Sequence, residues 1–296
     1  MRAIIDTDPG IDDAIAILYA LRSPALDIAA LTTVAGNIGL SVTTENAGRI
    51  AALADATVPV HPGAAAPLGR APRPETGIHG NDGLGGIVFP APLGAPSQVG
   101  AVEAMAKLLM DAPAHSLTLL CLAPLTNIAQ LLDKAPQAAA RIGRVIAMGG
   151  AVDEPGNVGP RAEFNIAHDP EAAARVFAAG LDLTLIPLDA TRQFRADAAY
   201  VARLHGSGAA PAIAAADLID AYFVQTAHQA KGTESRPLHD PCVPLLALHP
   251  DLFHIEPRDL AVDLDGALIP GPHRIKVAMG LDAEALRTRL LKGLSC

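Results

Sequence analysis

Residues 3–14 read AIIDTDPGIDDA, a short apolar run followed at once by four aspartates. The apolar run predicts a strand, and the spacing of the apolar residues after it predicts an amphipathic helix. Asp6 and Asp8 then leave the carboxyl end of the strand, whereas Asp12 and Asp13 lie in the first turn of the helix. Acidic residues in a first turn each contribute about 0.3–1 kcal/mol, which leaves Asp6 and Asp8 unexplained. Because buried anions are costly without a partner, we expect a cation in the crevice between them.

The rest of the chain repeats this pattern of strand and helix. Apolar runs that predict further strands cover residues 29–34, 58–60, 117–122, 145–148 and 183–187. Strands that alternate with helices predict an α/β fold, with a mostly parallel, Rossmann-like open sheet flanked by helices. Helical patterns at 197–205 and 211–230 interrupt the rhythm and predict a small helical cap region, and residues 282–294 predict a final amphipathic helix. The composition does not change along the chain, so we expect a single domain over residues 1–296.

The composition argues against several classes of partner. The 22 basic residues against 31 acidic ones give a net charge of -9, and without basic clusters this argues against binding to nucleic acid or to an anionic membrane surface. The apolar runs are too short for a signal peptide or a membrane span. Cys121, Cys242 and Cys296 are odd in number and lack metal-binding spacing, which favours a reducing compartment over a disulfide framework. We therefore expect a soluble, cytoplasmic protein.

Three irregular stretches separate the predicted elements. Residues 61–96 are dense in Pro and Gly and include His79, residues 151–167 follow a predicted strand, and residues 231–238 precede His239. A long connection such as 61–96 is either functional or flexible. In open α/β sheets, ligands bind outside the carboxyl ends of the strands, and the aspartates lie at one such end.

Two known aspartate motifs share part of this pattern. The calcium loop of an EF-hand begins Asp-x-Asp but requires a bidentate Glu at its twelfth position, where Ile17 stands in this chain. The EF-hand interpretation therefore fails. A phosphatase of the haloacid dehalogenase type ends its first strand in Asp-x-Asp, with the first acid, here Asp6, as nucleophile. The residues after Asp8 do not continue that motif, but such a phosphatase remains an alternative.

The stretch DTDPGIDDA, residues 6–14, resembles the signature of the inosine-uridine preferring nucleoside hydrolases. Further motifs that resemble this family follow in the same order: TTVAGN at 32–37, IHG at 78–80, PLTNIA at 124–129, MGG at 148–150, EFN at 163–165 and HDPC at 239–242. The resemblance implies hydrolysis of the N-glycosidic bond of purine or pyrimidine ribonucleosides, such as inosine or uridine, to free base and ribose. It also implies a homodimer or homotetramer.

The resemblance further implies a Ca²⁺ ion that also binds the 2′ and 3′ hydroxyls of ribose. Its implied ligands are Asp8, Asp13, Asp240 and the backbone carbonyl of Leu122. Hard oxygen ligands from separate loops suit Ca²⁺ better than Zn²⁺. Asp8 is also implied to take a proton from a calcium-bound water, which attacks C1′ through an oxocarbenium-like transition state. Asp6 matches a carboxylate behind the ligands and is expected to support them.

Other residues match positions that contact substrate in the family. Those that match ribose-binding positions are Asp12, Asn37, Asn157, Glu163 and Asn165. His79 and His239 are the candidate catalytic residues near the base, because an imidazole with a pKa near neutrality can protonate a leaving group. Candidates for contact with the base itself are Phe223, Gln225 and His228. A nucleoside- or ribose-binding protein without turnover is the non-enzymatic alternative.

Overall fold

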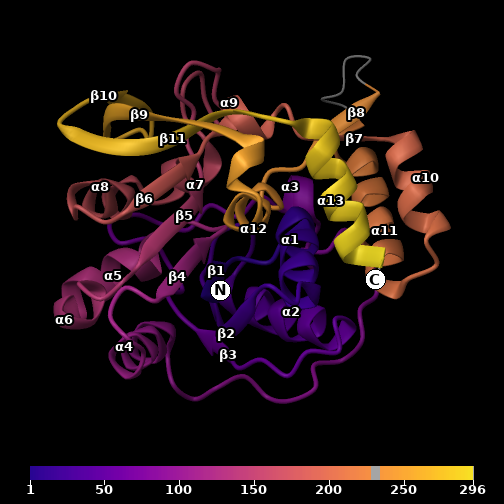
Figure 1. The fold of residues 1–296 in the computed structure, drawn as a ribbon, viewed down its shortest axis with the longest axis horizontal. Helices are drawn as coiled ribbons and strands as arrows, with labels where there is room; N and C mark the ends of the chain where they lie inside the picture. The colour runs from indigo at the N-terminus through magenta and orange to yellow at the C-terminus, as the bar shows by residue number, and fades with distance from the viewer. Residues whose placement is uncertain (228–233, 296) are drawn as a thin grey trace.

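Nine strands of the described chain, residues 1–227 and 234–295 of a computed structural model, form one open sheet (Figure 1). In chain order they are β1 (Arg2–Thr7), β2 (Asp27–Thr33), β3 (Val60–Pro62), β4 (Leu117–Cys121), β5 (Arg144–Met148), β6 (Leu183–Ile186), β9 (Phe253–Val262), β10 (Leu268–Pro270) and β11 (His273–Leu281). Across the sheet the order is β10-β9-β11-β6-β5-β4-β1-β2-β3. The first strand therefore lies inside the sheet, between β2 and β4.

The first six strands are parallel to their neighbours, as the sequence predicts. The chain runs outward from β1 through β2 to β3, and then returns to the other side of β1 to continue through β4, β5 and β6. Such a reversal leaves a crevice at the carboxyl ends of the two strands that flank it, and doubly wound sheets bind their ligands there. In this chain the two strands are β1 and β4, so the residues that follow β1 lie at the crevice.

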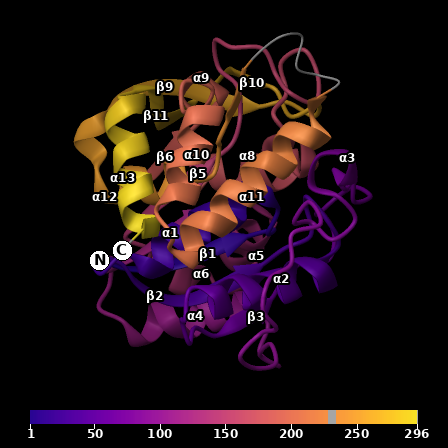
Figure 2. The same cartoon turned by 90° about the vertical axis from the view of Figure 1, so that its right-hand side faces the viewer.

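Helices form a layer on each side of the sheet. One layer contains α1 (Ile11–Arg22), α2 (Leu40–Leu53), α10 (Ala198–Gly206), α11 (Ala210–Gln225), α12 (Cys242–Leu248) and α13 (Ala283–Ser295). The other contains α4 (Ala101–Asp111), α5 (Thr126–Lys134), α6 (Pro136–Ala139) and α8 (Pro170–Ala178). Because side chains alternate along a strand, Ile5 of β1 packs in the first core and Ile4 in the second. Figure 2 shows α11 and α13 beside α1 in the first layer.

Short elements connect these layers near the crevice. They are α3 (Thr76–His79), α7 (Phe164–His168), α9 (Leu188–Thr191) and a 3₁₀ turn (Pro250–Leu252). A second, two-stranded sheet pairs β7 (Arg195–Asp197) with β8 (Ser235–Pro237) in antiparallel fashion. This small sheet brings together two segments that are far apart in the sequence.

The predicted α/β class with its mostly parallel open sheet is confirmed. The antiparallel edge formed by β9, β10 and β11 is absent from the prediction, because β9 carries Pro257 and several charges and has a weak strand signal. The helix predicted over 211–230 ends at Gln225, and residues 228–230 lie outside the described chain. The predicted cap region corresponds to α10 and α11, which pack against each other. Within the described ranges, every helix is too short or too polar to cross a membrane.

Candidate active site

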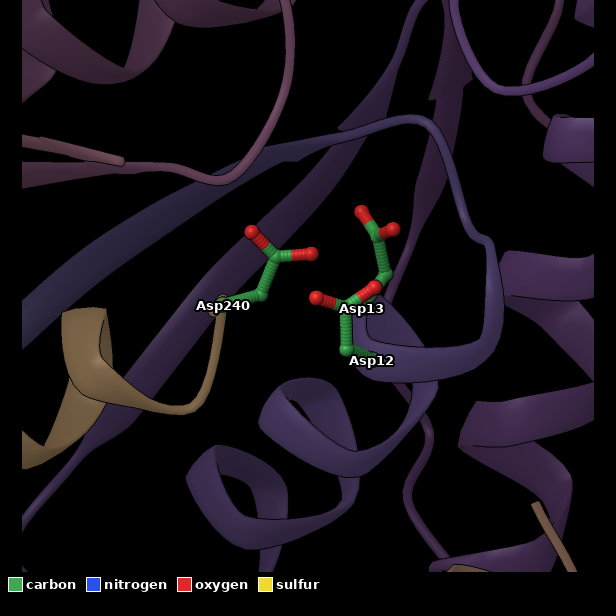
Figure 3. A group of neighbouring side chains, drawn as sticks. All are labelled: Asp12, Asp13 and Asp240. Carbon is green, nitrogen blue, oxygen red and sulfur yellow. The ribbon is translucent and has the colours of Figure 1, made fainter. Parts of the chain in front are cut away.

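Three carboxylates from opposite ends of the chain meet at the crevice (Figure 3). One oxygen from each of Asp12, Asp13 and Asp240 lies within 4.8 Å of the others. Burial raises the pKa of Asp13 to about 6, and burial together with the nearby aspartates raises the pKa of Asp240 well above its usual value. Like charges held this close disfavour ionisation, and a bound cation removes that cost. The group is therefore a candidate metal site.

Asp8 lies fully buried beside this group. Its Oδ2 accepts a hydrogen bond from the backbone N–H of Asn37 at 2.6 Å, but its Oδ1 has no hydrogen-bond partner among the described residues. Burial and the negative charge of Asp13 raise the pKa of Asp8. Gly36 makes room for this carboxyl group, since a side chain there would collide with Asp8 Oδ2. A buried polar atom without a partner calls for an explanation, and a metal ligand position provides one.

Several hydrogen bonds fix the carboxyl group of Asp13. Its Oδ1 accepts from the hydroxyl of Thr7 at 2.6 Å and from the backbone N–H of Asp8 at 3.3 Å. Its Oδ2 accepts from the backbone N–H of Gly10 and from Asn37 Nδ2, each at 3.0 Å. Since Asn37 also donates its backbone N–H to Asp8, this one residue ties the two aspartates together.

Asp6 lies behind the group, inside the sheet. Its Oδ1 accepts hydrogen bonds from the hydroxyl of Thr32 at 2.6 Å and from Asn127 Nδ2 at 2.8 Å. Burial raises the pKa of Asp6 to about 6. The side chain is 1% exposed, so no solute can reach it in this conformation.

A cavity of about 440 Å³ opens next to the carboxylates. Its wall includes Asp12, Asn37 and Asp240 together with His79 and His239. Clefts of roughly 300–1,000 Å³ are typical of small-molecule sites. The cavity therefore suits a small organic ligand that reaches the carboxylates at one side.

Two histidines in the cavity wall are oriented by hydrogen bonds. His79 Nδ1 accepts from the backbone N–H of Ile11 at 3.1 Å, so its proton is carried by Nε2. His239 donates its backbone N–H to Asp12 Oδ2 at 3.3 Å, and its Nδ1 lies 2.7 Å from the hydroxyl of Thr191. Burial lowers the pKa of both imidazoles. Both rings are thus held in fixed positions at the cavity.

The predicted ribose-binding residues of the second irregular stretch lie around α7. Glu163 caps this helix by accepting from the backbone of Asn165 at 2.9 Å, and it also accepts from the backbone of Gly150 at 2.8 Å. Asn165 Nδ2 donates to the carbonyl of Leu122 at 2.8 Å. Asn157 Oδ1 accepts from the backbone of residue 164 at 2.9 Å. These bonds hold the polar side chains at the carboxyl ends of β4 and β5.

Hydrogen bonds to two residues in and directly after α9 anchor the loop that carries Asn157. The carboxylate of Asp189 accepts hydrogen bonds from the backbone N–H groups of residues 152–154, at 2.7–3.0 Å. Arg192 donates to the carbonyls of Pro155 and Gly156, at 2.7 and 3.0 Å. The sequence gives no signal for this anchor, because its members have no motif and meet only in the folded chain.

A family model described as inosine-uridine preferring nucleoside hydrolase matches residues 3–288 of the chain. The chain belongs to this family. It is an N-glycosyl hydrolase that acts on nucleosides. The full-length match agrees with the geometry, because the aspartates, both histidines and the α7 loop come from segments spread over the whole chain.

Individual relatives of this nucleoside hydrolase are similar over nearly their whole length. A non-specific ribonucleoside hydrolase, RihC, from Shigella boydii is 38% identical over 300 residues, which cover 96% of this chain and 94% of the relative. A purine-preferring ribonucleoside hydrolase from Gardnerella vaginalis has a structure that matches with a TM-score of 0.94 at 28% identity, covering 100% of this chain and 98% of that one. A plant nucleoside hydrolase matches with a TM-score of 0.93 at 31% identity, covering 100% and 99%.

The cavity wall meets the end of α11 at residues other than the predicted base contacts. In the described chain, Phe223 and Gln225 do not line the cavity of the hydrolase, whereas Tyr222 and Thr226 do. Residues four apart lie on one side of a helix, so Tyr222 and Thr226 face the cavity together at the end of α11. The third candidate, His228, lies outside the described residues.

Three arginines in the cavity wall were not predicted. They are Arg192, Arg195 and Arg236. The first two follow α9 and the third lies in β8, so only the pairing of β7 with β8 brings them together. The spacing of these arginines in the sequence does not indicate that they form a group. The net negative charge of the chain does not indicate a positive region either.

Proposed function

We propose that this nucleoside hydrolase cleaves purine and pyrimidine ribonucleosides, inosine and uridine among them, to free base and ribose with Ca²⁺ as cofactor. The observation that carries the proposal is the unpartnered Oδ1 of Asp8, buried in a group of carboxylates beside a cavity of small-molecule size. A cation would satisfy the carboxylates, and the cavity would hold the nucleoside against them.

The donor set fits Ca²⁺. The residues that would hold the ion are Asp8, Asp13, Asp240 and Leu122, the last through its carbonyl. All of these offer hard oxygen atoms, which Ca²⁺ prefers. The Leu122 carbonyl already accepts a hydrogen bond from Asn165, but its second lone pair is available. When bound, the ion supplies a Lewis acid that orients the ribose hydroxyls and acidifies the attacking water. Asp6, behind this set, would keep the ligands in place.

Asp8 is proposed to take the proton of the water that attacks C1′. The backbone N–H of Asn37 fixes one carboxyl oxygen and leaves the other available for this work. The glycosidic bond breaks through an oxocarbenium-like transition state, and its electron pair moves to the base nitrogen. His239 and His79, held in the cavity wall, are proposed to serve the departing base as proton donor or relay.

The ribose hydroxyls are proposed to bind to polar side chains of the cavity wall. These are Asp12, Asn37, Asn157, Glu163 and Asn165, all of which line the cavity. Carboxylate and amide groups accept and donate hydrogen bonds in the pairs that vicinal hydroxyls require. A location in the cytoplasm and assembly into a homodimer or homotetramer complete the proposal.

The two alternatives from the sequence make different demands on the site. A phosphatase would need Asp6 as nucleophile, and that side chain is buried behind the other aspartates. A protein that binds nucleosides without turnover would use Asp8 as a metal ligand but not as a base, and the relatives that this chain resembles are hydrolases. Both observations favour the hydrolase.

The test is the turnover of Asp8→Asn compared with Asp259→Asn, a matched change of an exposed carboxylate on β9. We expect Asp8→Asn to lose at least about a thousandfold in kcat on inosine, within the range of a lost general base and metal ligand together. The control should keep its activity. An Asp8→Asn enzyme with full activity would remove Asp8 from the chemistry.

A further inference from the structure

The cavity wall carries two regions of opposite charge. Asp12 and Asp240 form the negative region, and the arginines at 192, 195 and 236 form the positive one. His239 lies between the two regions: its backbone N–H binds Asp12, and the charges of Arg192 and Arg195 act on its pKa. A nucleoside whose ribose lies on the aspartates would therefore place its base toward the arginines.

Unlike Arg192, which pairs with Glu154, Arg195 has no carboxylate partner among the described residues. Its Nε donates to the hydroxyl of Ser235 at 2.8 Å and its Nη2 to the carbonyl of Ser235 at 2.6 Å. Its Nη1 makes only a 3.5 Å contact with the carbonyl of Arg192. The side chain is partly buried, and burial lowers the pKa of Arg195 together with the nearby positive charges. An unmatched cation in a cavity wall favours an anionic ligand.

The other two arginines are engaged elsewhere. Arg192 pairs with Glu154 and holds the loop that carries Asn157. Arg236 donates to Thr226 and lies over the ring of Phe223, 4.8 Å from its centre. Both add positive potential around Arg195, whose Nη1 has no strong acceptor among the described residues.

We propose that Arg195 binds the nucleobase and stabilises it as an anion while the glycosidic bond breaks. This inference rests on the proposed function and adds a substrate preference to it. We expect the largest contribution of Arg195 to the rate for bases that delocalise a negative charge over a ring nitrogen and an exocyclic oxygen, such as uracil, hypoxanthine and xanthine. Adenine, which has an exocyclic amino group and no exocyclic oxygen, is expected to depend less on Arg195.

The step balances without another reactant. The bond between C1′ and the base nitrogen breaks, and its electron pair stays on the nitrogen. The attacking water forms the new bond to C1′ and gives one proton to Asp8. The base takes up one proton from a histidine of the cavity wall. The proton on Asp8 returns to solvent and the histidine regains one from solvent, so the products are ribose and neutral base. Arg195 stabilises the negative charge that develops on the base while the bond breaks and the proton transfer is incomplete, as preorganised charges do in a desolvated site.

The experiment measures kcat/KM of Arg195→Gln, Arg195→Lys and wild type on uridine, 5-fluorouridine and adenosine. Fluorine makes the departing uracil anion less basic and therefore less dependent on stabilisation. A lost charged hydrogen bond corresponds to about 10- to 100-fold in rate. We expect that loss for Arg195→Gln on uridine, a loss of only about threefold on 5-fluorouridine and on adenosine, and recovery of most activity in Arg195→Lys. Arg274→Gln, an exposed arginine on β11, is the matched control.

Outcomes separate the inference from the function on which it rests. Equal losses on all substrates, with a lower Tm, would mean that Arg195 only holds β7 to β8, and would overturn the inference. Unchanged activity of Arg195→Gln would overturn it as well. A wild-type enzyme that releases no base from any nucleoside would instead defeat the proposed function, and the inference would fall with it.

Discussion

The backbone N–H of His239 donates to Asp12 Oδ2 at 3.3 Å, and this bond joins the two ends of the active site. The two residues are 227 positions apart in the chain. Because Asp240 follows His239 directly, the bond also determines where Asp240 meets Asp13. The N-terminal aspartate motif and the later HDPC motif are thus one structural unit, and a change in either is expected to alter cation binding.

Asp240→Asn should stabilise the chelated protein and abolish its stabilisation by Ca²⁺. The change removes a buried charge that the other aspartates repel, and it also removes a proposed ligand. We expect the Tm of the chelated variant to exceed that of chelated wild type by about 2 °C, and to stay constant when Ca²⁺ is added. Thermal unfolding with and without Ca²⁺ measures both effects. A Ca²⁺-dependent rise in Tm equal to that of wild type would exclude Asp240 as a ligand.

Asp6 should make the chelated protein less stable as the pH rises. Burial raises its pKa from 3.8 to about 6 in the folded protein. The folded state holds this proton more tightly, so the stabilisation is complete below about pH 4 and is lost as the pH rises through about 6. The free energy of unfolding of wild type relative to Asp6→Asn should therefore fall over this interval, by at most about 3 kcal/mol. Urea unfolding of both chelated proteins tests this, and a difference that does not change with pH would refute it.

The parts of the site that can be predicted from the sequence are those that lie within one continuous stretch of residues. Residues 3–14 hold a strand, its carboxyl end and a helix start, so the positions of Asp8 and Asp13 follow from local patterns. Their grouping with Asp240 depends on the resemblance to a family, because nothing local links residue 240 to the first strand. The structure brings Asp12, Asp13 and Asp240 together, while the roles of these residues stay predictions.

Tertiary packing decides the features that sequence patterns miss. Helix α11 is apolar on most of its circumference, so its sequence does not tell that Tyr222 and Thr226 face the cavity. Arg195 donates a hydrogen bond to the carbonyl of Ser235 across β7 and β8, which are three-residue strands with little intrinsic preference. Such short pairings form only because the surrounding elements hold their ends.

Asp189→Ala should raise KM more than it lowers kcat. The carboxylate of Asp189 holds the backbone of residues 152–154, and this loop carries Asn157 to the cavity. Without the anchor, part of the binding energy is spent on ordering the loop, which we expect to raise KM about tenfold. Asp182→Ala, which removes an exposed carboxylate paired with Lys276, is the control. A KM equal to that of wild type would show that the anchor does not position the loop for substrate.

His239→Ala should cost about a hundredfold or more in kcat on inosine, the usual contribution of a general acid. The loss should be much smaller on a nitrophenyl riboside, because nitrophenolate leaves without a proton. Steady-state kinetics on the two substrates gives the comparison. Equal losses on both would contradict a role of the His239 ring in protonating the base.

The most direct test of the central claim is an assay for released reducing sugar on inosine, uridine, adenosine, guanosine and cytidine, with Ca²⁺ and after chelation. We predict ribose from at least inosine and uridine when Ca²⁺ is present, loss of that activity on chelation and its return when Ca²⁺ is restored. Ribose released at the same rate after complete chelation would contradict the metal-dependent mechanism. No ribose from any nucleoside, with tight nucleoside binding, would contradict hydrolysis itself.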